Sequence, residues 1–114
     1  MTSTLTPEGA QWLRKARDYI QSHPEELTLR SFRSIGNEIA RYCIAGHVCR
    51  LAGHRVSGWQ AAEILGFDSA VDYSPTSRVR ALFYGGLKEA GEIESLAETL
   101  ERINMFLDSY GYVR

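Results

Sequence analysis

The sequence lacks the features of a membrane protein, a secreted protein or a strongly basic nucleic-acid-binding protein. No apolar run approaches the ~18 residues that a membrane helix needs, and the first residues lack the basic and apolar parts of a secretory signal. Thirteen Lys and Arg residues against 14 Asp and Glu residues give a net charge of −1. Such a charge provides no general attraction to nucleic acid or to an anionic membrane. We therefore expect a cytoplasmic protein that does not contact a membrane.

Cysteine is also scarce, because the chain has only Cys43 and Cys49. Both lie in the apolar segment 42–53, which we predict to be helical. Six residues of helix separate two Cα atoms by roughly 9 Å, which exceeds the ~7 Å limit for a disulfide. The sequence therefore predicts two buried thiols that pack as small apolar side chains.

Length and composition predict a single ordered domain. The chain has 114 residues, of which 44% are hydrophobic and 24% are charged, as in an ordinary globular protein. This length suffices for one core but is too short to divide into two. We expect the domain to span residues 1–114, with residues 1–5 disordered.

Helical spacing and capping signals predict an all-α fold. Thr6 and Pro7 are typical of a helix start, and Ser57 with Gln60 and Ser95 with Glu98 form capping-box patterns. The segment 27–32 alternates apolar and polar residues and is expected to be an extended connection. The sequence predicts about five helices and no regular sheet, with helices at 7–22, 35–52, 59–65, 77–84 and 93–110.

The segment 35–52 is predicted to be the buried central helix of a compact domain. On a helical wheel, apolar residues cover nearly every side of this segment. A helix of this kind is buried among other elements rather than laid on the surface of the domain. Gly46 lies in its middle, where the missing side chain is expected to let another helix approach closely. On the last predicted helix, Glu94, Glu98 and Glu101 fall among alternating charges and are expected to form a solvated face rather than an acid–base pair.

Four short motifs resemble those of a group of small, uncharacterised bacterial and phage proteins. The resemblance covers roughly residues 12 to 110 and implies a helical fold without implying an activity. The chain departs from the pattern at His47, where an aromatic residue is common, and it lacks a second cysteine ahead of Cys43. The motifs are Cys43-Ile44-Ala45-Gly46, Ala62-Glu63-Ile64-Leu65-Gly66, Leu82-Phe83 and Arg102-Ile103-Asn104-Met105-Phe106.

Cys43, His47 and His54 are the candidate metal ligands, because spacings of four and seven place them on one helix face. Thiolate and imidazole groups bind zinc in such positions. His54 follows Gly53, however, and no fourth ligand is evident. Cys43 and His47 could also pair as a nucleophile and a base, but an apolar helix raises the pKa of a thiol. Buried, structural side chains are the simpler interpretation, so we predict no metal, no cofactor and no enzymatic activity.

The segment 57–84 is the basis of the alternative hypothesis, a regulatory nucleic-acid-binding protein of phage or mobile-element type. Residues 57–67 resemble the first helix and turn of a helix-turn-helix. The second helix would then contain Asp68, Asp72 and Pro75, and these residues oppose helix formation and phosphate binding.

The function that the sequence favours is a non-enzymatic module that binds another protein or itself, as in a homodimer. An arginine cluster at 30–41 could face an acidic partner, although such arginines commonly cap helices or form surface ion pairs. The aromatic C-terminal tail is expected either to fold back on the domain or to meet another subunit. The candidate partner-surface residues are Arg30, Arg33, Arg78, Arg80, Tyr110 and Tyr112.

Overall fold

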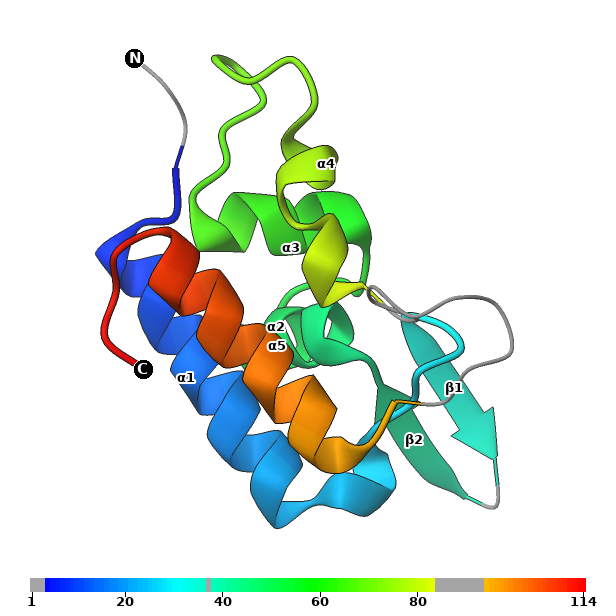
Figure 1. Cartoon of the computed structure of the whole chain (residues 1–114). Coiled ribbons are helices and arrows are strands. Elements are labelled where there is room, and N and C mark those ends of the chain that lie inside the picture. Colours follow the sequence, from blue (N-terminus) through cyan, green and yellow to red (C-terminus); the bar gives the residue numbers. More distant parts are fainter. Residues whose placement is uncertain (1–3, 37, 84–93) are drawn as a thin grey trace.

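The computed structural model describes residues 4–36, 38–83 and 94–114, and within these ranges the chain is mostly helical with one small β-hairpin (Figure 1). Its order of elements differs from the predicted one mainly between residues 33 and 43. The elements are α1 (Pro7–Ser22), the 3-10 turn η1 (Pro24–Glu26), β1 (Arg33–Gly36), β2 (Ile39–Tyr42), α2 (Ile44–Leu51), α3 (Gly58–Leu65), α4 (Pro75–Arg78), the 3-10 turn η2 (Arg80–Leu82) and α5 (Leu96–Ser109).

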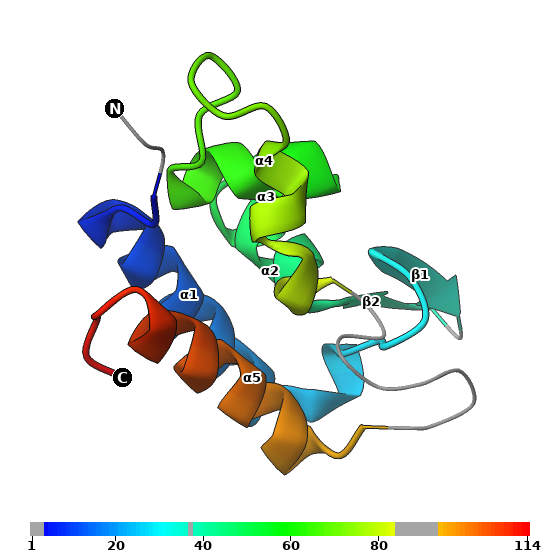
Figure 2. The same ribbon diagram turned by 45° about the horizontal axis from the view of Figure 1, so that its top comes forward.

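Helices α1 and α5 lie side by side and run in opposite directions, and α2 and α3 pack against α1 (Figures 1 and 2). α1 contacts α2, α3 and α5, so the main core forms where these four helices meet. The radius of gyration is 13.3 Å, which matches the value of about 13 Å expected for one compact domain of this length. In the described part of the chain, no helix is both long and apolar enough to cross a membrane. The largest fully buried apolar side chains of the described core are Leu5, Leu13, Ile20, Ile44, Leu65, Phe67, Leu82, Ile103 and Leu107.

The prediction of a central helix over 35–52 is wrong in its first half, and the fold is therefore not purely α-helical. Strands β1 and β2 pair antiparallel, with Gly36 opposite Ile39 and Arg33 opposite Tyr42. Glu38, in the connecting turn, has a left-handed φ of 63°, as residues of two-residue hairpin turns do. The sequence has Asn at position 37, a residue that such turns favour, but the apolar spacing of this segment also fits a helix.

Cys43 marks the point where the hairpin ends and α2 begins. Its backbone is extended, and its sulfur accepts a hydrogen bond from the Gly46 amide at 3.4 Å, so it is the N-cap of α2. The buried central helix is therefore only Ile44–Leu51. Gly46 does permit a close approach, but its close neighbour is the backbone carbonyl of Phe32 rather than a helix.

The capping signals located the other helices more accurately than the hydrophobic spacing did. Thr6 caps α1 and Ser57 caps α3 as predicted, and Ser95 and Glu98 form the capping box of α5. The predicted helix at 77–84 is wrong, because α4 begins earlier, at Pro75, and η2 ends at Leu82. The predicted start of the last helix at 93 is also wrong, because Glu94 and Ser95 are not helical and α5 begins at Leu96. The predicted stop at Gly85-Gly86 lies outside the described residues.

Glu94 and Arg102 form a buried ion pair, so the expectation of a solvated face is wrong for Glu94. Their side chains are only 7% and 6% exposed, and Arg102 Nη2 lies 2.8 Å from Glu94 Oε1. Arg102 also donates hydrogen bonds to the carbonyls of Ala81 and Phe83, and Thr99 donates one to Glu94. The pair therefore links α5 to the end of η2.

Both ends of the described chain pack on the domain. Leu5 is only 1% exposed, so the expected disorder does not extend to this residue, and residues 1–3 lie outside the described part. The Tyr110 ring packs edge-to-face against the Phe67 ring, with 5.5 Å between the ring centroids. The hydroxyl of Tyr112 donates a hydrogen bond of 2.7 Å to the Leu5 carbonyl. In the structure the C-terminal tail thus folds back on the domain.

We expect Gly46→Ala to lower the free energy of unfolding by about 1–3 kcal/mol, as overpacking does. The added Cβ would overlap the Phe32 carbonyl oxygen, and the helix backbone cannot move aside without disturbing the hairpin. Gly36→Ala is the matched control, because the nearest atom to its Cβ would be an Arg41 nitrogen at 3.9 Å. Urea unfolding monitored by circular dichroism compares the two. Equal stability of both variants would contradict the proposed crowding.

We expect Glu94→Gln to destabilise the fold by about 3 kcal/mol, because it leaves the Arg102 guanidinium buried without a counter-charge. Glu101→Gln is the matched control, since Glu101 pairs with Arg114 at the surface. Exposed pairs of this kind contribute about 0–1 kcal/mol. Chemical denaturation measures both, and a loss for Glu94→Gln no larger than that of the control would contradict the role given to the buried pair.

Candidate functional site

The structure does not bring the three candidate metal ligands together. Cys43 and His47 are buried, whereas His54 is exposed and lies 3.4 Å from the Gln60 amide nitrogen. In the described ranges no group of three or more His, Cys, Asp or Glu side chains is placed to hold a metal ion. His54 lies in the segment between α2 and α3, so the spacing of seven residues does not place it on the helix face of Cys43.

The two thiols occupy structural positions. Cys43 caps α2, and the Cys49 thiol donates a 3.4 Å hydrogen bond to the Ser57 carbonyl. No disulfide joins the two residues. Burial raises the pKa of the Cys49 thiol, which disfavours the thiolate that nucleophilic chemistry needs. The geometry gives no support to a Cys–His nucleophile.

His47 is a fully buried imidazole whose two nitrogens have partners of opposite kinds. Nε2 lies 2.9 Å from the Glu26 carbonyl oxygen, and Nδ1 lies 3.2 Å from Nη2 of Arg50. A carbonyl only accepts and a guanidinium only donates, so Nε2 carries the proton and the ring is neutral. Desolvation by burial, with a smaller contribution from the charge of Arg50, lowers the pKa of His47 to about 4, although the hydrogen bond to the Glu26 carbonyl acts in the opposite direction.

Arg50 is held in place by the aromatic side chains around it as well as by His47. Its guanidinium carbon lies 4.4 Å from the ring centroid of Tyr19 and 5.4 Å from that of Tyr42. The Tyr19 hydroxyl in turn donates to the Glu26 carboxylate at 2.9 Å. Nε of Arg50 is buried without a hydrogen-bond acceptor in the described part of the chain. This guanidinium therefore keeps unused bonding capacity.

Arg50 also belongs to the wall of an open hollow of about 660 Å³ between the base of the hairpin and the segment joining α2 to α3. Three of its eight lining residues are arginines and none is acidic, so the wall is strongly basic. The lining residues are Phe32, Arg33, Tyr42, Arg50, Gly53, His54, Arg55 and Val56.

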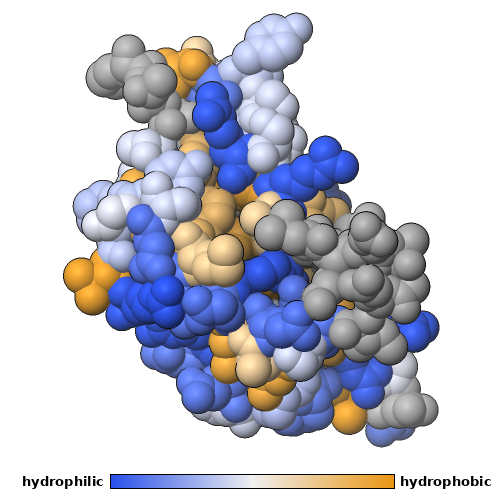
Figure 3. All heavy atoms as spheres, viewed as in Figure 1, coloured by the Kyte–Doolittle hydropathy of each residue, from blue (hydrophilic) through white to orange (hydrophobic). Residues whose placement is uncertain are grey.

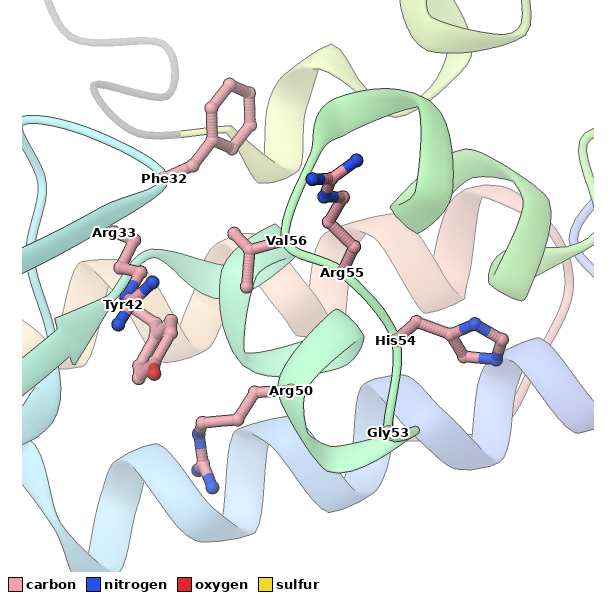
Figure 4. Close-up of a pocket in the computed structure, with 8 residues that line it drawn as sticks. All are labelled: Phe32, Arg33, Tyr42, Arg50, Gly53, His54, Arg55 and Val56. Atoms are coloured by element: carbon pink, nitrogen blue, oxygen red, sulfur yellow. The ribbon is translucent and has the colours of Figure 1, made fainter.

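The arginines lie on opposite sides of this basic hollow (Figure 4). Arg33 lies beside its cross-strand partner Tyr42, and Arg50 points towards α1, whereas Arg55 rises on the other side of Val56. Neither Arg33 nor Arg55 has an ion-pair partner among the residues that the structure describes. Separated and unneutralised guanidinium groups suit a ligand with several negative groups rather than a single small anion.

Of the six predicted partner-surface residues, only Arg33 lines the basic hollow. Arg30 and Arg80 are exposed elsewhere, and Arg78 pairs with Asp72 at 3.3 Å. Tyr110 and Tyr112 pack on the domain as described above. The structure therefore does not gather the six residues into one surface.

Sequence reasoning missed Arg50 and Arg55 as site residues, although a local charge count would have indicated them. Residues 30–55 contain five arginines and a single acidic residue, Glu38. The acidic C-terminal half conceals this excess in the net charge of −1. The contribution of Tyr42 could not be found in this way, because it depends on the hairpin register.

A second, smaller hollow lies between α5 and η2. It has a volume of about 150 Å³ and is mainly apolar, with Met105 and Phe106 in its wall. In the space-filling view, apolar side chains gather in the middle of this face and hydrophilic side chains surround them (Figure 3). Its two polar lining residues are already engaged, because Arg102 pairs with Glu94 and the Ser109 hydroxyl donates to the Phe106 carbonyl. This hollow therefore has little polar capacity left to orient a ligand.

Comparison of the chain with protein-family models, curated proteins and solved structures gave no match in any of the three. The resemblance to bacterial and phage proteins therefore stays a prediction, and the candidate site is defined by its own geometry.

We expect stability to fall between pH 6.5 and pH 4 because of His47. The pKa in the fold is about 4, below the ordinary value of about 6.5. Between about pH 6.5 and pH 4, His47 therefore binds a proton in the unfolded chain but not in the folded chain. The contribution of neutral His47 to the free energy of unfolding is complete above pH 6.5, and about 3 kcal/mol of this contribution is lost when the pH falls to 4.

His47→Gln tests this, because it removes the titrating group. The difference in unfolding free energy between the wild type and this variant should shrink by about 3 kcal/mol from pH 7 to pH 4. The difference for the matched variant of the exposed His54, His54→Gln, should change far less. A difference that is constant with pH for His47→Gln would show that His47 does not control the acid sensitivity.

Proposed function

We propose that this protein is a non-enzymatic interaction module that binds an acidic segment of another protein in the basic hollow. The supporting observation is the wall of this hollow, where Arg33, Arg50 and Arg55 face no lining carboxylate. Acidic side chains in the bound segment would supply the counter-charges that the described residues of the chain do not. Arginine is suited to this role because its planar donors engage carboxylates in pairs.

The aromatic and apolar parts of the wall also suit a peptide. Phe32 and Val56 line the hollow together with the arginines, and the Tyr42 ring packs against the Arg50 guanidinium. Protein-binding surfaces are typically rich in aromatic residues and arginine. Because His47 and the tyrosine rings already hold Arg50, this guanidinium loses little conformational freedom when a ligand binds.

The alternative, nucleic-acid binding through residues 57–84, has less support. α4 contains only four residues, which is too short for a helix that reads the major groove. Arg78 in this region is paired with Asp72, so part of its charge is already neutralised. Arg80 and the exposed Trp59 are the features of this region that would favour a nucleic acid.

Fluorescence anisotropy with a labelled peptide of eight glutamates tests the proposal at low ionic strength, with a peptide of eight glutamines as the neutral probe. We expect the double variant Arg33→Ala/Arg55→Ala to bind the acidic peptide at least tenfold more weakly than the wild type. The control, Arg30→Ala/Arg80→Ala, removes two exposed guanidinium groups outside the hollow and should bind within about threefold of the wild type.

Equal weakening by the two double variants would contradict the proposal, because it would reveal a general charge effect. A single-stranded oligonucleotide of eight nucleotides serves as the competing probe. Tighter binding of this probe, weakened by Arg80→Ala and not by Arg33→Ala, would favour the nucleic-acid alternative. Light scattering of the protein alone would detect self-association, in which a second copy supplies the acidic segment.

A further inference from the structure

The outer edge of β1, next to the basic hollow, has no partner strand among the residues that the structure describes. The Cys43 amide donates to the Phe32 carbonyl at 3.3 Å, so residues 32 and 43 belong to the hydrogen-bonded set of the ladder. Antiparallel pairs alternate, and Ser34 and Gly36 therefore also face β2. Arg33 and Ile35 direct their backbone N–H and C=O groups to the outer edge of β1.

Most of these outward groups have no partner. The Ser31 hydroxyl donates to the Arg33 carbonyl at 2.8 Å, which is consistent with the outward direction of this carbonyl. The Arg33 amide and both backbone groups of Ile35 have no hydrogen bond within the described part of the chain. The opposite edge of the hairpin differs at Tyr42, whose carbonyl accepts a hydrogen bond from the Thr28 amide.

The open edge and the basic hollow adjoin each other. Arg33 begins β1 and also lines the hollow. Cross-strand partners share a face, and successive residues alternate between faces, so Ile35 projects on the same side of the sheet as Arg33 and Tyr42. Ile35 is 64% exposed. A strand along this edge would thus meet one apolar and one basic side chain on the face of the hollow.

We infer that the acidic segment binds as a third strand on the outer edge of β1, with every second side chain directed towards the basic hollow. This inference rests on the proposed function and specifies how the partner is held. Side chains two residues apart on a strand lie on one face at a spacing of roughly 7 Å. A segment with acidic residues at alternate positions would therefore bring successive carboxylates to the arginine-lined side.

Charge complementarity selects this occupant over other strands. A basic or neutral strand would leave Arg33 and Arg55 unneutralised, whereas an acidic strand satisfies the backbone edge and the hollow together. Backbone pairing supplies affinity in such strand addition, and alternate side chains supply specificity. β1 has only four residues, so neither the edge nor the hollow is expected to hold a partner tightly alone.

A labelled eight-residue peptide of alternating Glu and Thr tests the inference on the full chain. Two further peptides of the same sequence are N-methylated at all Glu or at all Thr residues. All three carry the same charge, but each methylated peptide blocks the N–H groups of one strand edge only. We expect one methylated peptide to bind at least tenfold more weakly than the parent, and the other to bind within about threefold.

Binding of both methylated peptides like the parent would overturn the strand inference and leave the proposed function intact. Loss of binding by both would also overturn it, because a strand added at one edge uses one set of N–H groups. If none of the peptides binds, the parent included, and eight glutamates do not bind either, the proposed function itself fails.

A pair of variants tests the protein's own edge. Ile35→Pro removes an outward N–H that the hairpin ladder does not use, so the hairpin can persist. Ile35→Ala shortens the side chain and keeps this N–H. We expect only the proline variant to weaken binding of the parent peptide at least tenfold, with circular dichroism confirming the fold. If the proline variant is unfolded, the methylated peptides still decide between the outcomes.

Discussion

The two hydrogen bonds of the buried His47 imidazole connect the core of this protein to its candidate site. Through Nε2 the ring holds the Glu26 carbonyl, so it joins η1 to α2, and through Nδ1 it holds Arg50. A neutral imidazole has one donor and one acceptor, and both are used inside a site that excludes water. Protonation would remove the acceptor and place a cation next to a guanidinium. The position of Arg50 at the basic hollow therefore depends on the neutral state of a core residue.

The side of the hollow that Phe32, Arg33 and Tyr42 form depends on the junction between the hairpin and α2. The Cys43 amide bonds to the Phe32 carbonyl at the end of the hairpin ladder, and the same residue is the N-cap of α2. Strand β2 and helix α2 therefore cannot move independently. The missing side chain of Gly46 allows the Phe32 backbone to pack on α2. These two contacts place Phe32, Arg33 and Tyr42 opposite the segment that carries Arg55. A short helix and a hairpin of two four-residue strands, each marginal alone, stabilise one another here.

Sequence reasoning found the features that are decided locally and missed those that depend on distant partners. The caps at Thr6, Ser57 and Ser95 need only the next three residues, so their patterns predicted the helix starts. Residues 35–42 have apolar spacing compatible with a helix or a strand, and only pairing across the turn selects the strand. Glu94 has the sequence context of a surface carboxylate, but Arg102 and the end of η2 bury it. The hollow, built from three separate segments, has no local signature except its excess of arginine.

That excess shows why net charge is a poor guide to binding in a chain of this size. Several acidic residues outside residues 30–55 are already paired, since Arg114 forms ion pairs with Glu101 and Asp108, and Arg102 forms one with Glu94. Within the described part of the chain, the arginines of the hollow have no ion-pair partner, although the whole sequence has a net charge of −1. Interactions between exposed charges are largely screened beyond about 10 Å at an ionic strength of about 0.1 M. A ligand at the hollow therefore experiences the local guanidinium groups, and the unpaired edge of β1 beside them adds a directional requirement that charge alone does not supply.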